Sequence, residues 1–497
     1  MNKDKVRKLL SKSDWNEETI NVFSEIIDRL TIEHLGLVVY PNQFEIVSAE
    51  QMLDAYSLIG LPISYNHWKF GKDFAMNNNQ YKKGQMGLSL EMVINSNPCI
   101  SYNIEENTTC QMALVYAHVQ GHNAFFRNNY LFKQWTQADA IIDYMVFAKK
   151  YIADCEEKYG YEEVERMLDA CHSLMNYGVD KYKKPSKISP EEESKRYRKK
   201  IEDDRISLDD IWRTLPKEDK KIEESIRFPE QPEENILYFI EKNSPILKGW
   251  QREIVRIVRK VSQYFYPQGQ TKVINEGVAS FTHFELINKM FEDGYLDEGF
   301  MMEFLHNHSS VVFQPDFDSK YYSGLNPYTL GFNILRDMKR MSLEPTSEDL
   351  EWFPNIAGKG KWKEEFLYII ENFKDDTFIL QYLSPNVIRD MKLFEISDES
   401  YSKYYRVTDI HDEEGYKNIR KNLSEYYNRS RYVPDIQVYD VDVHGDRTLT
   451  LEYTSIDEKE LSANSVNGVL PHIKYLWGFP VRILKREGER KRILYSM

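Results

Sequence analysis

Two histidines in one predicted helix have the spacing of metal ligands. His118 and His122 are one helical turn apart in the run 117–126, so both imidazoles lie on one face. The HExxH zinc pattern has the same spacing, and its glutamate acts as the general base. That position is Val119 here, so the ligand half of the pattern is present and its usual base is missing. The alternative interpretation is two core histidines bonded to backbone groups.

A second predicted helix carries a carboxylate and a histidine on one face. Glu276 and His283 are two turns apart, with Asn275 and Gly277 flanking the glutamate. This stretch is similar to the helix that supplies the third zinc ligand in gluzincin metalloproteases. We therefore expect a zincin-like pair of helices whose ligands are His118, His122 and Glu276, with one open position. We expect His283 beside them, as a fourth ligand or as a partner of a ligand.

The ligand types limit the metal and leave the base to be found. Zinc is the default for two histidines and a carboxylate, and iron or manganese also suits this set. The nearest acidic residues along the chain are Glu105 and Glu106, just before the helix that carries His118. We take them as candidates for the catalytic base. The alternative is that their charges complement the helix macrodipole at its N-terminus.

Composition excludes several classes of protein. The net charge of −14 disfavours nucleic acid as a generic partner. The four cysteines form no CxxC pair, which over 497 residues indicates a reducing compartment. The sequence shows neither an apolar signal core nor an apolar run of about 20 residues, so we predict a cytoplasmic protein without a transmembrane segment.

Hydrophobic periodicity predicts a mainly α protein with a small α+β insert near residues 61–105 and an α/β module at the C-terminal end. The expected divisions follow the order of the chain. They are a helical region with the HxxxH motif (1–182), a charged linker or insertion (183–234), a helical region with the Asn-Glu-Gly motif (235–404) and the α/β module (405–497).

Nine short motifs, taken together and in order, resemble the stage V sporulation protein R (SpoVR) family over nearly the whole chain. Two positions depart from the family pattern: Val278 stands where tryptophan is usual, and Gln120 where an aromatic residue is expected. Both are neighbours of expected ligands. The motifs are Tyr40–Gln43, His67–Lys72, Val93–Ile100, Gly121–Phe126, Leu168–His172, Trp250–Ile254, Asn275–Gly277, Asn326–Tyr328 and Asp440–Arg447.

The resemblance implies a bacterial protein that takes part in forming the spore cortex, a modified peptidoglycan layer. It also implies a PrkA-type serine kinase as a functional partner. It brings no settled reaction with it, so two hypotheses stay open. One is a metal-dependent hydrolase acting on a peptide or a cell-wall precursor. The other is a non-catalytic regulatory or scaffold protein, with a structural metal or none.

Overall fold

The chain folds as a mainly helical protein with small sheets, as the sequence predicts. It divides into two compact units, each built from two segments: residues 1–169 with 260–433, and residues 170–259 with 434–497. The computed structural model describes residues 3–58, 64–82, 90–181, 195, 199, 227–397, 406–409, 411–429, 432–455, 460–487 and 490–497. Most of the predicted charged linker at 183–234 lies outside the described residues.

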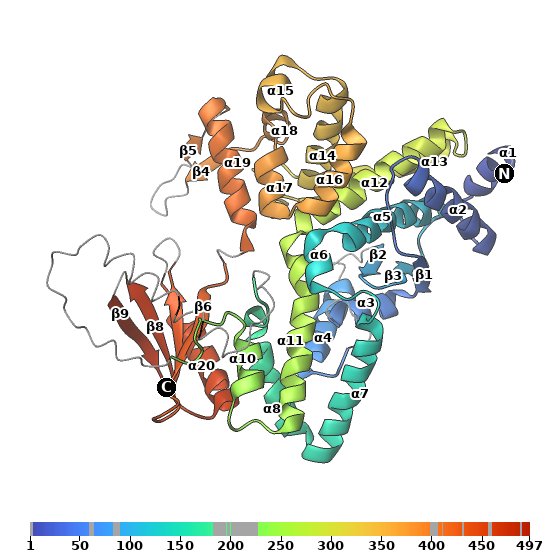
Figure 1. Cartoon of the computed structure of the whole chain (residues 1–497). Helices are drawn as coiled ribbons and strands as arrows, with labels where there is room; N and C mark the ends of the chain where they lie inside the picture. Colours follow the sequence, from blue (N-terminus) through green and yellow to red (C-terminus); the bar gives the residue numbers. More distant parts are fainter. Residues whose placement is uncertain are drawn as a thin grey trace. The chain divides into compact units, whose positions relative to one another are not determined.

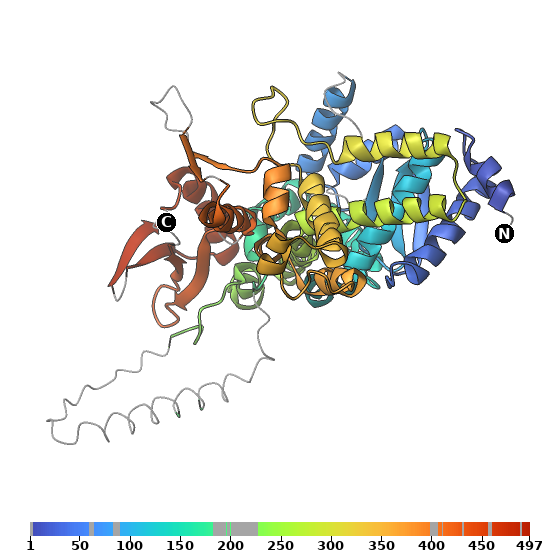
Figure 2. The same ribbon diagram turned by 90° about the horizontal axis from the view of Figure 1, so that it is seen from above.

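The first unit holds most of the helices (Figure 1). Seen from two directions, α12 and α13 lie side by side and are joined by a short turn (Figures 1 and 2). The elements of the first unit are α1 (Lys3–Leu10), α2 (Glu17–Glu33), β1 (Asn42–Val47), α3 (Ala49–Ser57), α4 (Trp68–Lys82), β2 (Glu91–Ile94), β3 (Cys99–Ile104), α5 (Thr109–Asn128), α6 (Tyr130–Trp135), α7 (Ile141–Tyr159), α12 (Lys272–Glu292), α13 (Glu298–Val311), α14 (Pro327–Leu343), α15 (Ser347–Trp352), α16 (Trp362–Asn372), α17 (Asp375–Tyr382), α18 (Pro385–Asp390), β4 (Glu395–Ser397), β5 (Arg406–Asp409) and α19 (Glu413–Tyr427).

Helix α5 lies at the centre of this unit. A capping box fixes its start, because the Thr108 side chain accepts the Gln111 N–H and the Gln111 side chain accepts the Thr108 N–H. From Thr109 to Phe126 nearly every residue is buried, which is typical of a helix enclosed on all sides. Helices α2, α12, α13 and α16 contact it, as do strands β2 and β3. Polar groups on α5 therefore lie in the core.

A three-stranded sheet borders α5 in the order β1-β3-β2. Strand β3 pairs parallel with β1 and antiparallel with β2. The predicted insert at 61–105 thus contains helix α4 and two strands. Strand β1 was not predicted, although Phe44, Ile46 and Val47 supply β-favouring residues there.

The second unit contains the C-terminal sheet, whose strand order is β6-β7-β8-β9. Strands β7 and β8 pair parallel and the other two pairs are antiparallel. The predicted module at 405–497 extended too far toward the N-terminus, since β5 and α19 belong to the first unit. The elements of the second unit are a 3₁₀ turn (Met175–Tyr177), α10 (Ile236–Asn243), β6 (Asp435–Val441), β7 (Leu449–Thr454), α20 (Ala463–Trp477), β8 (Val481–Glu487) and β9 (Arg490–Ser496). Two further helices, α8 (Tyr161–His172) and α11 (Gly249–Gln270), have residues in both units.

Two prolines lie in helix interiors, where a proline ordinarily ends or kinks a helix. Pro267 lies inside α11 and Pro471 lies inside α20. A proline in a helix interior costs about 3 kcal/mol, so packing elsewhere must offset it. In α20 the neighbours Leu470 and Ile473 are buried and supply such packing. Among the described residues, no helix has both the length and the apolar character needed to cross a membrane.

Glycines allow three helices of the first unit to touch backbone to backbone. A Cβ on Gly121 of α5 would lie 2.5 Å from the Cα of Ala279 on α12. A Cβ on Gly277 of α12 would lie 2.6 Å from the backbone of Gly331 on α14. Real Cβ atoms do not approach so closely, and backbone atoms cannot move aside as a side chain can. Glycine at these positions therefore sets the distance between α5, α12 and α14.

This close approach predicts the effect of adding one methyl group. Gly121→Ala and Gly277→Ala should each lower the free energy of unfolding by about 1–3 kcal/mol, because the helices must separate. Gly71→Ala in α4 is the matched control, since nothing lies within 4 Å of its Cβ position. It should be neutral or stabilising by up to about 1 kcal/mol through helix propensity. Urea unfolding measures all three, and equal effects at the three positions would contradict the predicted clash.

Candidate metal centre

Three of the expected ligands face one another between α5 and α12. His122 Nε2 lies 3.5 Å from Glu276 Oε2, and His118 Nε2 lies 3.8 Å from the same oxygen. One ligand atom from each residue falls within 4.8 Å of the other two. The helical turn between the histidines places both rings on one face of α5, and the glycine contact of α5 with α12 brings the carboxylate to them.

The polar atoms of this group suit a cation. Within the described part of the chain, neither His118 Nε2 nor Glu276 Oε2 has a hydrogen-bond partner, although both atoms are buried. Leaving such atoms unpaired costs on the order of 1–3 kcal/mol each. Two ligands on one tetrahedral zinc, with bonds of about 2.0–2.1 Å, are about 3.3 Å apart. The observed N···O separations are close to this value, so the residues fit a bound zinc.

Hydrogen bonding prepares His122 as a ligand. Its Nδ1 lies 3.0 Å from Oδ1 of Asn275, the residue before Glu276. An amide oxygen only accepts, so Nδ1 carries the proton and Nε2 keeps a free lone pair. Burial lowers the pKa of His122 to about 4, outweighing the opposing effect of Glu276. His122 is therefore neutral near pH 7, the form that binds metals.

A second carboxylate, which the sequence analysis missed, joins the group from β2. Glu91 Oε1 lies 3.7 Å from His118 Nε2. Burial raises the pKa of Glu91, and the nearby Glu276 raises it further. Burial also acts to raise the pKa of Glu276, but the two imidazoles and a hydrogen bond from Tyr328 outweigh it, so the net pKa is lowered. Two carboxyl groups whose pKa values are pushed apart are typical of acid–base sites.

Tyr328 closes the group from the first turn of α14. Its hydroxyl donates a hydrogen bond to Glu276, and its ring stacks on His118 with centroids 6.3 Å apart. Burial raises the pKa of Tyr328, so the hydroxyl stays a neutral donor. The sequence signal was the motif Asn326–Tyr328, in which Asn326 caps α14. That motif gave no indication that the ring would reach α5.

His283 lies beside the group and outside it. Its Nδ1 is 3.0 Å from His118 Nδ1, on the side of that ring opposite to the carboxylates. Its Nε2 is 2.7 Å from Nδ1 of His308 on α13. Both ring nitrogens are thus engaged by other imidazoles, so the structure supports the partner role for His283 rather than that of a fourth ligand.

The structure does not bring Glu105 and Glu106 to the histidines. Both are exposed in the turn between β3 and α5. His118 is nine residues beyond the first residue of α5, which is about 14 Å along a helix axis. Closeness along the chain misled the prediction here, because a helix carries successive residues away from its start. Val119, at the position of the usual base, is fully buried in the core.

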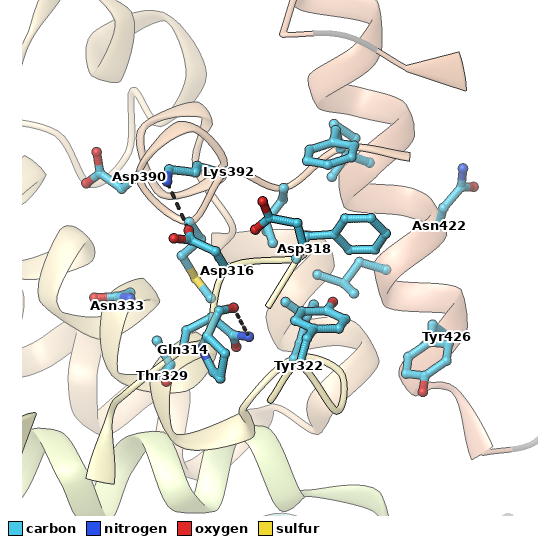
Figure 3. Close-up of a pocket in the computed structure, with 18 residues that line it drawn as sticks. Gln314, Asp316, Asp318, Tyr322, Thr329, Asn333, Asp390, Lys392, Asn422 and Tyr426 are labelled. Carbon is cyan, nitrogen blue, oxygen red and sulfur yellow. Dashed lines mark hydrogen bonds and ion pairs between the residues drawn. The ribbon is translucent and has the colours of Figure 1, made fainter. Parts of the chain in front are cut away.

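A separate hollow of about 810 Å³ lies between the α13–α14 loop, the end of α18 and α19 (Figure 3). Asp316, Asp318 and Asp390 line it, and Lys392 Nζ pairs with Asp316 Oδ1 at 3.0 Å. The described residues of its wall include none of the candidate ligands. The hollow is therefore distinct from the candidate metal centre.

Another helix caps the start of α12, the helix that carries Glu276. The side chain of Thr271, the N-cap residue of α12, makes no capping hydrogen bond within the described structure. Asp375 of α17 accepts the Ile274 N–H at 2.9 Å instead. The backbone N–H groups of Val273 and Lys272 also hydrogen-bond to this carboxyl. Burial nevertheless raises the pKa of Asp375 to about 7, because these bonds offset the loss of solvation only in part.

Comparison with known proteins gives a consistent result. The family model described as SpoVR like protein matches residues 14–432, and the model described as SpoVR-like C-terminal domain matches residues 434–488. An uncharacterized protein of Escherichia coli (strain K12), YcgB, is 51% identical over 492 residues, which cover 98% of this chain and 96% of that protein. No solved structure matches the chain.

The cap of α12 predicts a pH dependence of stability. The pKa of Asp375 is about 7 in the fold against an ordinary 3.8, so its contribution is fully present below pH 3.8 and is lost as pH rises through 7. Asp375→Asn keeps an acceptor oxygen and removes the ionisation. The unfolding free energy of the variant should therefore gain on the wild type by up to about 4 kcal/mol between pH 4 and 7.5.

Urea unfolding of both proteins across this pH range measures the difference, in which other titrating groups cancel. Asp14→Asn, at an exposed position, controls for the change in net charge. A difference between Asp375→Asn and wild type that stays constant with pH would contradict the raised pKa.

Proposed function

The chain belongs to the SpoVR family, and from this premise we propose that its buried two-histidine, one-carboxylate group is the metal centre of a hydrolase. The observation that carries the proposal is the convergence of His118, His122 and Glu276, with buried atoms left unpaired among the described residues. Zinc is the metal that this ligand set favours, with iron and manganese as alternatives.

The metal and the protein would supply different parts of the chemistry. A bound zinc acts as a Lewis acid and lowers the pKa of its water toward 7. Glu91 is the residue placed to accept a proton, since it is a second carboxylate beside His118 that is not needed as a third ligand. It thus takes the role that Val119 leaves vacant. Tyr328 donates to Glu276 and holds that carboxylate toward the histidines.

The substrate class follows from the family's association with the spore cortex. We propose a peptide or a cell-wall precursor as substrate, a role in sporulation and peptidoglycan modification, and a cytoplasmic location. A PrkA-type serine kinase is the proposed partner. These assignments depend on the family alone, whereas the metal centre depends on the geometry of this chain.

One observation favours a second candidate function. His118 and His122 are only 3% and 7% exposed, which also suits a metal that holds α5 and α12 together. In that case the protein is a regulatory or scaffold protein without catalysis. The two candidates agree on the ligands and differ on whether Glu91 has a chemical role.

Metal content tests the ligands. Purified wild-type protein should hold about one equivalent of metal by mass spectrometry, whereas His118→Ala and Glu276→Gln should lose most of it, because each removes one of three ligands. His306→Ala is the matched control, since this histidine is exposed on α13. Metal that is absent from the wild type, or unchanged in both ligand variants, would mean that the histidines are core residues.

Glu91→Gln separates the two candidate functions. The substitution keeps the shape of the side chain and removes its capacity to take a proton. We expect it to retain metal within about threefold and to lower the release of fragments from purified muropeptides by about 100-fold or more, the usual contribution of a general base. Liquid chromatography with mass spectrometry follows the products. Metal-loaded wild type that leaves the muropeptides intact, together with a lower melting temperature on metal removal, would favour the structural metal.

A further inference from the structure

Three buried imidazoles form a hydrogen-bonded row from the candidate metal centre to α13. His118 Nδ1 contacts His283 Nδ1 at 3.0 Å, and His283 Nε2 contacts His308 Nδ1 at 2.7 Å. The rings come from three helices, α5, α12 and α13. Each contact has the length of a hydrogen bond, so one proton lies between each pair of nitrogens.

The surroundings of these imidazoles favour the neutral forms of His283 and His308. His118, His283 and His308 are 3%, 0% and 5% exposed. His308 lies against the rings of Phe284, Phe304 and Phe332. A cationic imidazolium at His283 or His308 is costly in such an environment, whereas His118, which faces Glu91 and Glu276, is neutral in the form that binds a metal. Each ring therefore carries one proton and has one acceptor nitrogen.

With one proton on each ring, a metal bound at His118 determines the tautomer of all three imidazoles. Binding through Nε2 requires a lone pair there, so the proton of His118 is on Nδ1 and is donated to His283. His283 Nδ1 then accepts, and its own proton is on Nε2, where it is donated to His308. His308 accepts at Nδ1 and holds its proton on Nε2. The opposite order would put a proton on His118 Nε2, where it blocks metal binding.

We propose that His283 and His308 are positioning residues that hold His118 in its metal-binding tautomer and orientation. The inference rests on the proposed metal centre and extends it to α13. It assigns His283 as an acceptor for His118, and His308 as the acceptor that keeps the proton of His283 away from His118. The alternative is that both rings only fill space in the core.

Paired substitutions of His308 separate these roles. His308→Asn places an acceptor oxygen near the position of Nδ1, whereas His308→Leu fills the aromatic pocket without an acceptor. The positioning role predicts that the asparagine variant keeps zinc affinity within about threefold and that the leucine variant loses about 10-fold or more, as is typical for such partners of ligands. Zinc affinity is measured by competition with a chromophoric chelator, and melting temperatures establish that both variants fold.

The possible results have distinct meanings. Leucine and asparagine variants that bind zinc equally well would overturn the positioning role and leave the metal centre intact. A wild type that binds no zinc would overturn the metal centre and the positioning role with it. If His308→Leu fails to fold, ring ¹⁵N shifts of zinc-loaded, ¹⁵N-histidine-labelled wild type give the answer. Protonated Nε2 on both His283 and His308 supports the proposal, and protonated Nδ1 on either overturns it.

Discussion

The candidate site depends on how closely three helix backbones approach one another. Gly121 lets α5 touch α12, and the pair Gly277 and Gly331 lets α12 touch α14. At this distance the short reach of an imidazole and a glutamate is enough for their polar atoms to come within 3.5–3.8 Å. One additional carbon at either contact would separate the groups that the chemistry requires. The glycines thus determine the position of Glu276 as much as they determine the packing.

Such an arrangement places polar atoms where water cannot solvate them, and the fold compensates for each in turn. Asn275 accepts from His122, Tyr328 donates to Glu276, and His283 pairs with His118. Two atoms that face the centre of the group, His118 Nε2 and Glu276 Oε2, are left without a hydrogen-bond partner within the described residues. Unpaired buried polar atoms are rare in native proteins and each calls for an explanation. A bound cation accounts for both His118 Nε2 and Glu276 Oε2 at once.

The sequence predicted what depends on local order. Helical periodicity identifies α5, and the one-turn spacing places His118 and His122 on one face. Helix α12 and the C-terminal strands were also found from their patterns. Local patterns cannot show which helix ends pack against which, so the cap that Asp375 provides for α12 was not predictable.

The partners of the site were harder to predict for the same reason. Glu91 comes from a sheet edge and Tyr328 from a helix more than two hundred residues later, so neither shares a sequence motif with the histidines. A carboxylate within the apolar strand β2 was the one available signal for Glu91. Glu105 and Glu106 were chosen for closeness along the chain, and the turn before α5 leaves them in solvent.

A crystal structure of the full chain with zinc, recorded at the zinc absorption edge, would show whether the metal centre exists. We expect one anomalous peak about 2.0–2.2 Å from His118 Nε2, His122 Nε2 and a Glu276 oxygen, with His283 outside the coordination sphere. A peak bound elsewhere, or no peak between α5 and α12 in zinc-saturated crystals, would contradict this expectation.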